Sequence, residues 1–440
     1  MIISKNKKIG DLAYKDDLTG YLNKNYLIDF IESGPQQKPS KNNALLIIHL
    51  DNLNLVKLIY GHKALDQLIL EKSQNLLKLP IENKTYFRYS ENDFLIYIKD
   101  YQDDQWLNEL CQEILLLLNE STTSIESKSV VSHKIGVLRL NQNHQDSGEL
   151  FKNIEIVINK LSEALNSQLY FFDDAMEEDT LLGENIEAEL RKIDNNDYSD
   201  EFYMVFQPML DLKTHKIVAF EALARWESQT MGFISPMKFI DIAEKTQLIA
   251  PLGDWILRES CRFLKKLEKK GYTDIRVAIN ISVAQLLQDS FVDNFLRIVR
   301  SFEVDIKNIE LEITETVLSH DYTDINKKLS ILSKMGVNIS LDDFGTGYSS
   351  LSRLKNLSID IIKIDQSFIN SIHSSDQDDV FINSIIALAG QLNLTVVAEG
   401  VETQEQKDYL HNINCDIIQG YLFSRPLSEN DAILLLRDTN

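Results

Sequence analysis

Residues 339–347 read ISLDDFGTG, an apolar strand that runs directly into two adjacent carboxylates, Asp342 and Asp343. Six further segments show the same pattern, in which a short apolar run ends in a carboxylate, an amide or an amine. These segments are AFEALAR (219–225), VAINIS (277–282), IELEITE (309–315), IIKID (361–365), TVVAEG (395–400) and IIQGY (417–421). Chance rarely repeats such a placement, whereas a barrel gathers the carboxyl ends of its strands around one mouth.

The sequence around these segments alternates between strand-like and helix-like runs. The candidate strands are 202–210, 216–226, 274–282, 308–314, 338–344, 359–365, 394–400 and 415–421. Amphipathic helical segments separate the later strands, and in one of them (377–393) Phe381, Ile385 and Leu388 fall on one stripe. This alternation predicts an α/β fold with a TIM-like (β/α)₈ barrel. Because only DLKTHK (211–216) separates the first two strands, we expect the first strand to be antiparallel.

The chain of 440 residues is too long for one core, so we expect two domains. Residues 1–177 read as mixed α and β, with strands near NALLIIHLD (43–51) and DFLIYIKD (93–100). Residues 178–201 are acidic and helix-prone and then break up, so they are predicted to be a linker helix. The barrel then occupies residues 202–440.

The composition excludes several classes of protein. The formal net charge of −22, with no basic stripe, argues against binding of a nucleic acid polymer. No apolar run is long enough to cross a bilayer, and the first residues lack the apolar core of a signal peptide, so no membrane association is expected. The scattered Cys111, Cys261 and Cys415 fit a reducing cytoplasm as buried hydrophobes.

The strand ends carry hard oxygen donors without a thiolate or an imidazole. These donors are Glu221, Asn280, Glu312, Asp342 and Asp343. Such ligands select Mg²⁺ or Mn²⁺ over zinc. Neighbouring strand residues point to opposite faces, so Asp342 and Asp343 serve one site only if the strand ends there. Two close carboxylates repel unless two cations share them, and two cations can activate a water on a phosphodiester.

The remaining strand-end residues suggest other roles. Lys363 is an ammonium between acidic neighbours that could offset phosphate charge, and Arg225 could bind a phosphate oxygen. Glu399 is a candidate base and Gln419 a neutral hydrogen-bonding partner. Taken singly, each residue is more often a helix cap, a surface charge or a partner of the backbone. The joint pattern favours one site. For Glu315 two roles remain open, that of a metal ligand and that of a support for the loop after Asp343.

The motifs FQPML, FEALAR, AINIS, LEITET, LDDFGTGYSS, IKID, AEGVE and QGYLFSRPL resemble, in order, those of the EAL family of cyclic di-GMP phosphodiesterases over about residues 200–435. The resemblance implies one metal on Glu221, Asn280, Glu312 and Asp342, and a second metal shared by Asp342 and Asp343. It implies that Lys363 positions the attacking water and that Glu399 acts as base or as a partner of the second metal. It further implies nucleotide contacts from Gln207 and Arg225, loop support from Glu315, and completion of the site by Gln419.

The first half resembles the GGDEF family of diguanylate cyclases through DDLTGYLNKNYL, HLDNLNLVKLIYGHKALDQL and RYSENDF, over residues 16 to about 175. Several of the family's functional positions are replaced. Ser90, Glu91 and Asn92 stand where the signature has two glycines and its first acidic residue, His49 replaces a metal-binding Asp, and Lys57 replaces a base-contacting Asn. Glycines there let a backbone approach a triphosphate, so the replacements predict a cyclase-like domain without cyclase activity.

We therefore expect a phosphodiesterase that hydrolyses cyclic di-GMP to linear pGpG with two Mg²⁺ or Mn²⁺ ions. The alternatives are a cyclic di-GMP receptor with little hydrolysis and a phosphodiesterase for another nucleotide. The inactive half would regulate or dimerise the protein, and it could bind a nucleotide or a protein partner. His49 and His62 are read as ordinary, partly buried histidines rather than metal ligands, and the pair His320-Asp321 is attributed to chance.

Overall fold

The computed structural model describes residues 13–32, 42–119, 131–140, 147–163, 168–192, 201–315, 317, 322–345, 351–372 and 376–439. The chain divides into two compact units, Met1–Leu181 and Leu182–Asn440, and each is described by itself. Among the described residues, no helix has both the length and the apolar character needed to span a membrane. His320-Asp321 lies outside the described residues.

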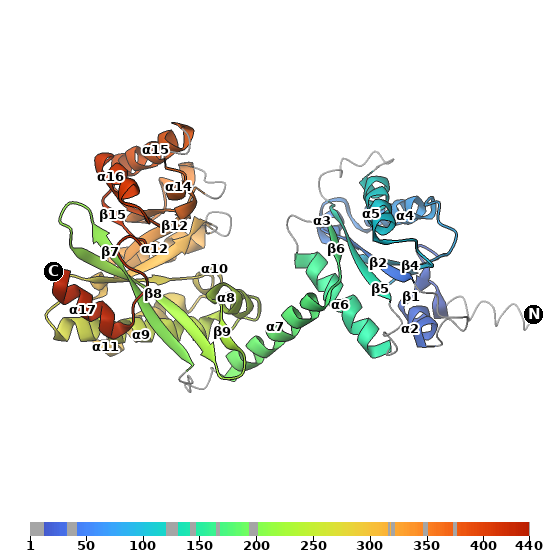
Figure 1. Ribbon diagram of the computed structural model, residues 1–440, viewed down its shortest axis with the longest axis horizontal. Coiled ribbons are helices and arrows are strands. Elements are labelled where there is room, and N and C mark those ends of the chain that lie inside the picture. The colour runs from blue at the N-terminus through green and yellow to red at the C-terminus, as the bar shows by residue number, and fades with distance from the viewer. Residues whose placement is uncertain are drawn as a thin grey trace, which may run out of the picture. The chain divides into compact units, whose positions relative to one another are not determined.

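The N-terminal unit contains a six-stranded sheet with helices on both faces (Figure 1). The strand order is β1 (Leu22–Asn23), β3 (Lys84–Arg88), β4 (Asp93–Lys99), β2 (Asn43–Leu50), β5 (His133–Leu140) and β6 (Leu169–Phe171). The helices are α2 (Lys24–Glu32), α3 (Leu53–Tyr60), α4 (His62–Leu77), α5 (Asp104–Asn119) and α6 (Ser147–Glu163).

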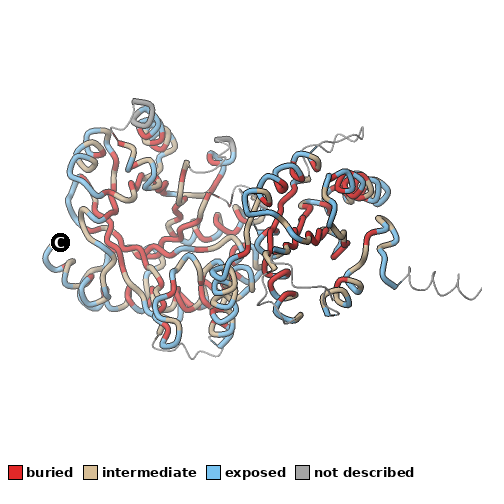
Figure 2. Tube along the Cα trace, turned by 45° about the vertical axis from the view of Figure 1, so that its right-hand side comes forward, coloured by how far each residue is buried: buried red, intermediate tan, exposed pale blue. Residues whose placement is uncertain are grey.

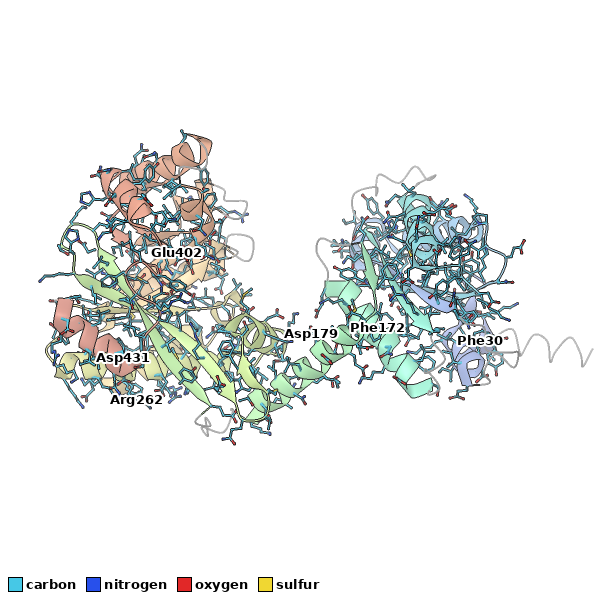
Figure 3. The ribbon with its side chains drawn as sticks, viewed as in Figure 1. Phe30, Phe172, Asp179, Arg262, Glu402 and Asp431 are labelled. Carbon is cyan, nitrogen blue, oxygen red and sulfur yellow. The ribbon has the colours of Figure 1, made fainter. Side chains whose placement is uncertain are left out.

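Both faces of this sheet are buried because alternate residues of its central strand point to opposite sides. Leu46 and Ile48 of β2 join the core under α3, α4 and α5. Leu45 and Ile47 join the core under α2 and α6, to which Phe172, labelled in Figure 3, also belongs. A strand covered on both faces reads as a continuous apolar run, as NALLIIHL does.

The C-terminal unit is an eight-stranded barrel, as the sequence predicts. Its strands are β7 (Phe202–Asp211), β8 (Ile217–Ser228), β10 (Arg276–Asn280), β11 (Ile309–Thr314), β12 (Asn338–Phe344), β13 (Ile361–Ile364), β14 (Thr395–Ala398) and β15 (Ile417–Ile418). β7 pairs antiparallel with both β8 and β15, and the other pairs are parallel, with β8 and β10 closing the barrel. The expected antiparallel first strand is therefore confirmed. A short strand, β9 (Gly232–Ile234), pairs antiparallel with β8 outside the closed ring.

Helices surround the barrel and bury its largest core. They are α8 (Pro236–Lys245), α9 (Ile249–Lys269), α10 (Val283–Leu286), α11 (Phe291–Phe302), the 3₁₀ helix η3 (Ile306–Asn308), α12 (Tyr322–Lys334), α13 (Leu351–Leu354), α14 (Gln366–Asn370), α15 (Asp376–Leu392), α16 (Gln404–Asn412) and α17 (Glu429–Thr439). Figure 2 shows buried residues along the strands and exposed residues on the outer turns of the helices. An ion pair between Lys266 and Glu429 joins α9 to α17, the helices that carry the labels Arg262 and Asp431 in Figure 3.

Two sequence expectations differ from the structure in detail. On α15, Ile385 is buried but Phe381 is 40% exposed, because Ile382 rather than Phe381 faces the core. The helix expected from residue 178 is α7 (Asp174–Lys192), which begins four residues earlier. Its last turns bury Ile186 and Leu190 against the barrel helices. Residues 193–200 of the expected linker lie outside the described residues.

Candidate active site

The interior of the barrel is built in layers. An apolar layer contains Met209, Ala219, Ala278, Ile361, Val397 and Ile417. Two residues further toward the mouth, the strand points its side chain to the same side. These positions carry Gln207, Glu221, Asn280, Lys363, Glu399 and Gln419. On β11 and β12 the buried Glu310 and Ser340 are followed in the same way by Glu312 and Asp342.

Each strand thus contributes one polar side chain to a single layer near the mouth. We call it the polar layer, and its members are Gln207, Glu221, Asn280, Glu312, Asp342, Lys363, Glu399 and Gln419. The strand register supports the common level, because Asn280 pairs with Glu312 and Gln207 pairs with Glu221. All eight positions were singled out from the sequence, and the structure brings all eight together.

Lys363 lies at the centre of the polar layer and is fully buried. Its Nζ is 2.6 Å from Glu399 Oε1, 2.7 Å from Glu312 Oε1, 3.4 Å from Asp342 Oδ1 and 4.0 Å from Glu221 Oε2. One ammonium therefore contacts four carboxylates in a place with little access to water.

Amide side chains fix the orientation of the Glu221 carboxylate. Asn280 donates from Nδ2 to Oε1 of Glu221 at 2.8 Å, and Gln419 donates from Nε2 to Oε2 at 2.6 Å. Gln419 Nε2 also lies 3.2 Å from Oε1 of Gln207. Glu221 is thereby held rigidly, with both oxygens aimed into the barrel.

The backbone around Asp342 and Asp343 explains how adjacent residues reach one site. The register of β12 against β13 shifts between Leu341 and Phe344, and Asp343 adopts the left-handed region with φ 55°. This bulge turns the Asp343 side chain away from the alternation of a regular strand. Asp342, Asp343 and Glu399 each offer a ligand atom, and these atoms lie within 4.8 Å of one another.

The loop after β12 is attached to Glu315, as one of the two sequence readings proposed. Gly345 donates its backbone N–H to Glu315 Oε2 at 3.0 Å. Gly345 has φ +102°, and a Cβ there would lie 2.8 Å from the ring of Phe368. Glycine is therefore the residue that permits both the turn and the close approach of α14. Thr346 and Gly347 lie outside the described residues.

Arg225 is the predicted site residue that stands apart from the polar layer. It lies four residues beyond Glu221 on β8, and its Nη1 donates to the carbonyl of its neighbour Ala224 at 2.9 Å. A residue that the sequence prediction missed is Asp365, which caps α14; burial, then Asp342 and then Asp365 raise the pKa of the Asp343 carboxyl. Its position two residues after Lys363 in IIKID was the available signal.

The crowded charges shift the ionisation of the polar layer. Burial raises the pKa of Glu399 to about 8 and the pKa of Glu312 well above its usual value, against the opposing effect of Lys363. Burial also acts to raise the pKa of Glu221, but Lys363 and the hydrogen bonds from Gln419 and Asn280 hold it below its usual value. For Lys363, burial would lower the pKa, yet the carboxylates raise it well above the usual value.

These residues fit a site for divalent cations. Glu221, Glu312, Asp342, Asp343 and Glu399 with Lys363 leave a formal charge of −4 when all are ionised. Glu312 is buried with Oε1 against Lys363, while its Oε2 has no hydrogen-bond partner among the described residues, so that oxygen is available to a ligand. The donor set is all oxygen, which suits Mg²⁺ or Mn²⁺.

In the N-terminal unit, the acidic residues beside His49 are paired with other protein groups. His49 is buried, with Nδ1 2.7 Å from Asp93 Oδ1 and Nε2 3.1 Å from Asp51 Oδ1. Lys134 pairs with the other oxygen of Asp51, and Ser90 donates to the other oxygen of Asp93. Protein groups therefore contact all four carboxylate oxygens, and Lys134 leaves Asp51 and Asp93 with less net negative charge than the barrel site has.

The other replaced positions lie beside this cluster. Lys57 is 3.9 Å from Glu91, and Asn92 donates from Nδ2 to the carbonyl of Leu50 at 3.1 Å. The expectation of two partly buried histidines is wrong for both, since His49 is buried and His62 is exposed.

The N-terminal unit also contains a cavity of about 400 Å³. It is lined by His62 and Glu91 together with Asp16, Leu18, Asn23, Lys24, Asn25, Leu65, Asp66, Ile69, Arg88, Tyr89 and Ser90.

Comparison with known proteins gives two family matches. The EAL domain family matches residues 191–426, and the family described as diguanylate cyclase, GGDEF domain, matches residues 13–168. Cyclic di-GMP phosphodiesterase NbdA of Pseudomonas aeruginosa is 31% identical over 420 residues, which cover 94% of this chain and 53% of NbdA. The chain thus spans about half the length of this curated relative.

Two solved structures are also similar to this chain. One described as PaMucR phosphodiesterase in complex with c-di-GMP is 35% identical, with a TM-score of 0.53, and covers 56% of this chain and 99% of that chain. Vibrio cholerae LapD, as an S helix-GGDEF-EAL chain bound to c-di-GMP, shares the fold with a TM-score of 0.60 over 96% of this chain and 98% of that chain. At 18% identity, that likeness concerns the fold alone.

Proposed function

The chain belongs to the EAL domain family and also carries a GGDEF domain, and on that premise we propose that it hydrolyses cyclic di-GMP to linear pGpG. The relative NbdA carries the name of a cyclic di-GMP phosphodiesterase, and the similar PaMucR structure holds c-di-GMP. Residues 202–440 would form the catalytic domain, 178–201 a linker, and 1–177 a regulatory domain.

The observation that carries the proposal is the polar layer around Lys363. Four carboxylates within 4.0 Å of one buried ammonium are more negative charge than that ammonium neutralises. Two divalent cations would balance the formal charge of −4. Glu221, Asn280, Glu312 and Asp342 would hold one of them, and Asp342 and Asp343 would hold the second. Bound there, the cations would activate a water and stabilise the departing oxygen of a phosphodiester.

The other residues would position the reactants. Lys363 would hold the attacking water in line with the scissile bond by donating from Nζ. Glu399 would accept a proton or support the second cation. Gln207 and Arg225 would contact the nucleotide, Gln419 would keep Glu221 oriented, and Glu315 would hold the loop that carries Asp343.

We further propose that the N-terminal unit lacks cyclase activity and regulates the barrel. His49 and Lys134 neutralise the carboxylates that a metal would need, and Ser90 and Glu91 add bulk and charge at the signature. The unit would act in a homodimer or by binding a nucleotide or a protein partner. We also propose a cytoplasmic location, which the three scattered, buried free cysteines support.

The test is an incubation of the full chain with cyclic di-GMP and Mn²⁺ or Mg²⁺, followed by chromatography of the products. Linear pGpG is expected with metal and not with EDTA, and Glu221→Gln is expected to abolish it. Binding without turnover in either metal would instead place the protein among cyclic di-GMP receptors. Faster turnover of another cyclic nucleotide would replace the substrate in the proposal.

A further inference from the structure

Strands β7 and β8 continue well beyond the polar layer. β8 pairs with β10 as far as Ala222, opposite Ile279, but runs on to Ser228. This outer part of β8 (223–228) pairs with the start of β7 (202–205) and with β9 (232–234). We call these three segments the hairpin arm. In Figure 1 they form the end of the long β7–β8 ribbon that leads to β9.

One face of the hairpin arm is packed into the barrel's helical core. Phe202, Trp226 and Ile234 point to that face and are at most 7% exposed. The ring of Trp226 stacks on Phe202 at 4.5 Å and meets Phe239 of α8 edge-on at 5.8 Å. The arm is therefore held rigidly in place, and its other face has a fixed direction.

The other face continues the inner wall of the barrel. Alternation along β7 and β8 puts Val205 and Leu223 above the pair Gln207–Glu221, and Tyr203 and Arg225 above those. Phe233 of β9 lies opposite Glu227 on the same face. With about 3.3 Å per residue, Leu223 lies about 7 Å and Arg225 about 13 Å along the strand from Glu221.

This face exposes two aromatic rings beside a guanidinium. Tyr203 is 43% exposed and Phe233 is 59% exposed, although the rings on the opposite face are buried. Among the described residues, Arg225 makes no ion pair, and its one hydrogen bond is to the carbonyl of Ala224. The flat face of Tyr203 next to the unpaired Arg225 suits a planar, electron-rich ring attached to a phosphate, and Phe233 extends the aromatic surface beyond Glu227.

We propose that Tyr203 and Phe233 form a stacking platform for a purine base of the substrate, and that they set its specificity. The inference rests on the proposed function, since the occupant is the base next to the phosphodiester at the polar layer. Continuity carries the assignment, because the same strand face runs from Gln207 and Glu221 through Arg225 to the two rings. Stacking on one aromatic side chain contributes about 1–3 kcal/mol per base.

The experiment compares Tyr203→Ala, Phe233→Ala and the ring-conserving Tyr203→Phe in the full chain. Leu434→Ala is the matched control, an exposed apolar residue on α17 (49% exposed) outside the arm. Binding of fluorescently labelled cyclic di-GMP is measured with Ca²⁺ in place of Mn²⁺ to limit turnover. Hydrolysis of cyclic di-GMP and of bis(p-nitrophenyl) phosphate, a diester without a purine, is measured with Mn²⁺.

Each alanine variant is expected to weaken binding of cyclic di-GMP by about 5- to 150-fold, as a loss of about 1–3 kcal/mol requires. KM for cyclic di-GMP rises accordingly. The value of kcat/KM falls far more for cyclic di-GMP than for the small diester. Tyr203→Phe and Leu434→Ala bind as the wild type does. Since both rings are exposed, melting temperatures stay near that of the wild type.

Unchanged binding in both alanine variants would overturn the platform, as would an equal loss on both substrates, which would indicate damage to the polar layer. If the wild type binds cyclic di-GMP without cutting it, the proposed function fails. The binding measurements on the alanine variants would still show whether Tyr203 and Phe233 contact the base. If a second copy of the chain or another protein covers this face, binding of the nucleotide stays unchanged and only the oligomeric state responds. That result also counts against the platform.

Discussion

Replacing Lys363 by methionine removes the one ammonium from the polar layer and leaves its carboxylates buried together. Breaking a buried ion pair by removing one partner costs about 3–5 kcal/mol because it leaves uncompensated charge. For a domain of about 150–250 residues, 1 kcal/mol shifts the melting temperature by about 2–4 °C. In EDTA, Lys363→Met is therefore expected to melt about 6–20 °C below the wild type.

The loss should depend on pH in a defined direction. Burial raises the pKa of Glu399 to about 8 in the folded state, against an ordinary 4.5. A carboxyl whose folded pKa is raised keeps its full stability below about pH 4.5 and loses it as the pH rises through about 8. Without Lys363 the carboxyl pKa values rise further, so protons neutralise more of the cluster at pH 6. The difference in melting temperature between Lys363→Met and the wild type should therefore be larger at pH 8.5 than at pH 6.

Differential scanning calorimetry in EDTA at pH 6 and pH 8.5 measures both effects. Lys328→Met is the matched control, since Lys328 is 7% exposed on α12, donates to the carbonyls of Leu286 and Gln288 and pairs with one exposed carboxylate, Asp324, rather than with a buried cluster. Its melting temperature should fall by the same amount at pH 6 and at pH 8.5. Equal stability of Lys363→Met and the wild type in EDTA at pH 8.5 would refute the electrostatic reasoning.

Three other outcomes follow from the structure. His133 is buried, and burial lowers its pKa to about 4 from 6.5, so the N-terminal unit should lose up to about 3 kcal/mol as the pH falls from 6.5 to 4, by denaturant titration; His133→Leu should remove this pH dependence, and an equal loss in the wild type and His133→Leu would argue otherwise. Gly420→Ala should lower kcat strongly, because a Cβ there would lie 2.1 Å from the carbonyl oxygen of Val401 and displace Gln419 from Glu221; wild-type kcat would contradict this. Incubation with GTP and Mg²⁺ should yield no cyclic di-GMP, and any product on chromatography would overturn the reading of the N-terminal unit.

The polar residues of the barrel could be predicted because local sequence determines them. Each lies at the end of a short apolar run, and the period of two in a strand places it on the inner face. The length of DLKTHK (211–216) likewise decides that β7 and β8 are antiparallel. Such features depend on neighbours in the chain, so a single sequence contains them.

Other features depend on tertiary contacts and could not be read from the chain. The left-handed backbone of Asp343 follows from the register shift of β12 against β13. The burial of His49 depends on Asp93 of β4, which the fold brings against His49 and Asp51 of the segment HLD. The exposure of Tyr203 depends on how far β8 extends past β10, which the apolar pattern FYMVF does not reveal.

The central claim is that the polar layer holds two divalent cations and hydrolyses a phosphodiester with them. The most direct measurement counts bound Mn²⁺ per chain and the linear pGpG formed from cyclic di-GMP in the same sample. We predict two Mn²⁺ ions per wild-type chain with steady product formation, and fewer bound Mn²⁺ ions with no product in Glu221→Gln. A wild type that binds cyclic di-GMP and forms no product at saturating Mn²⁺ would contradict the claim.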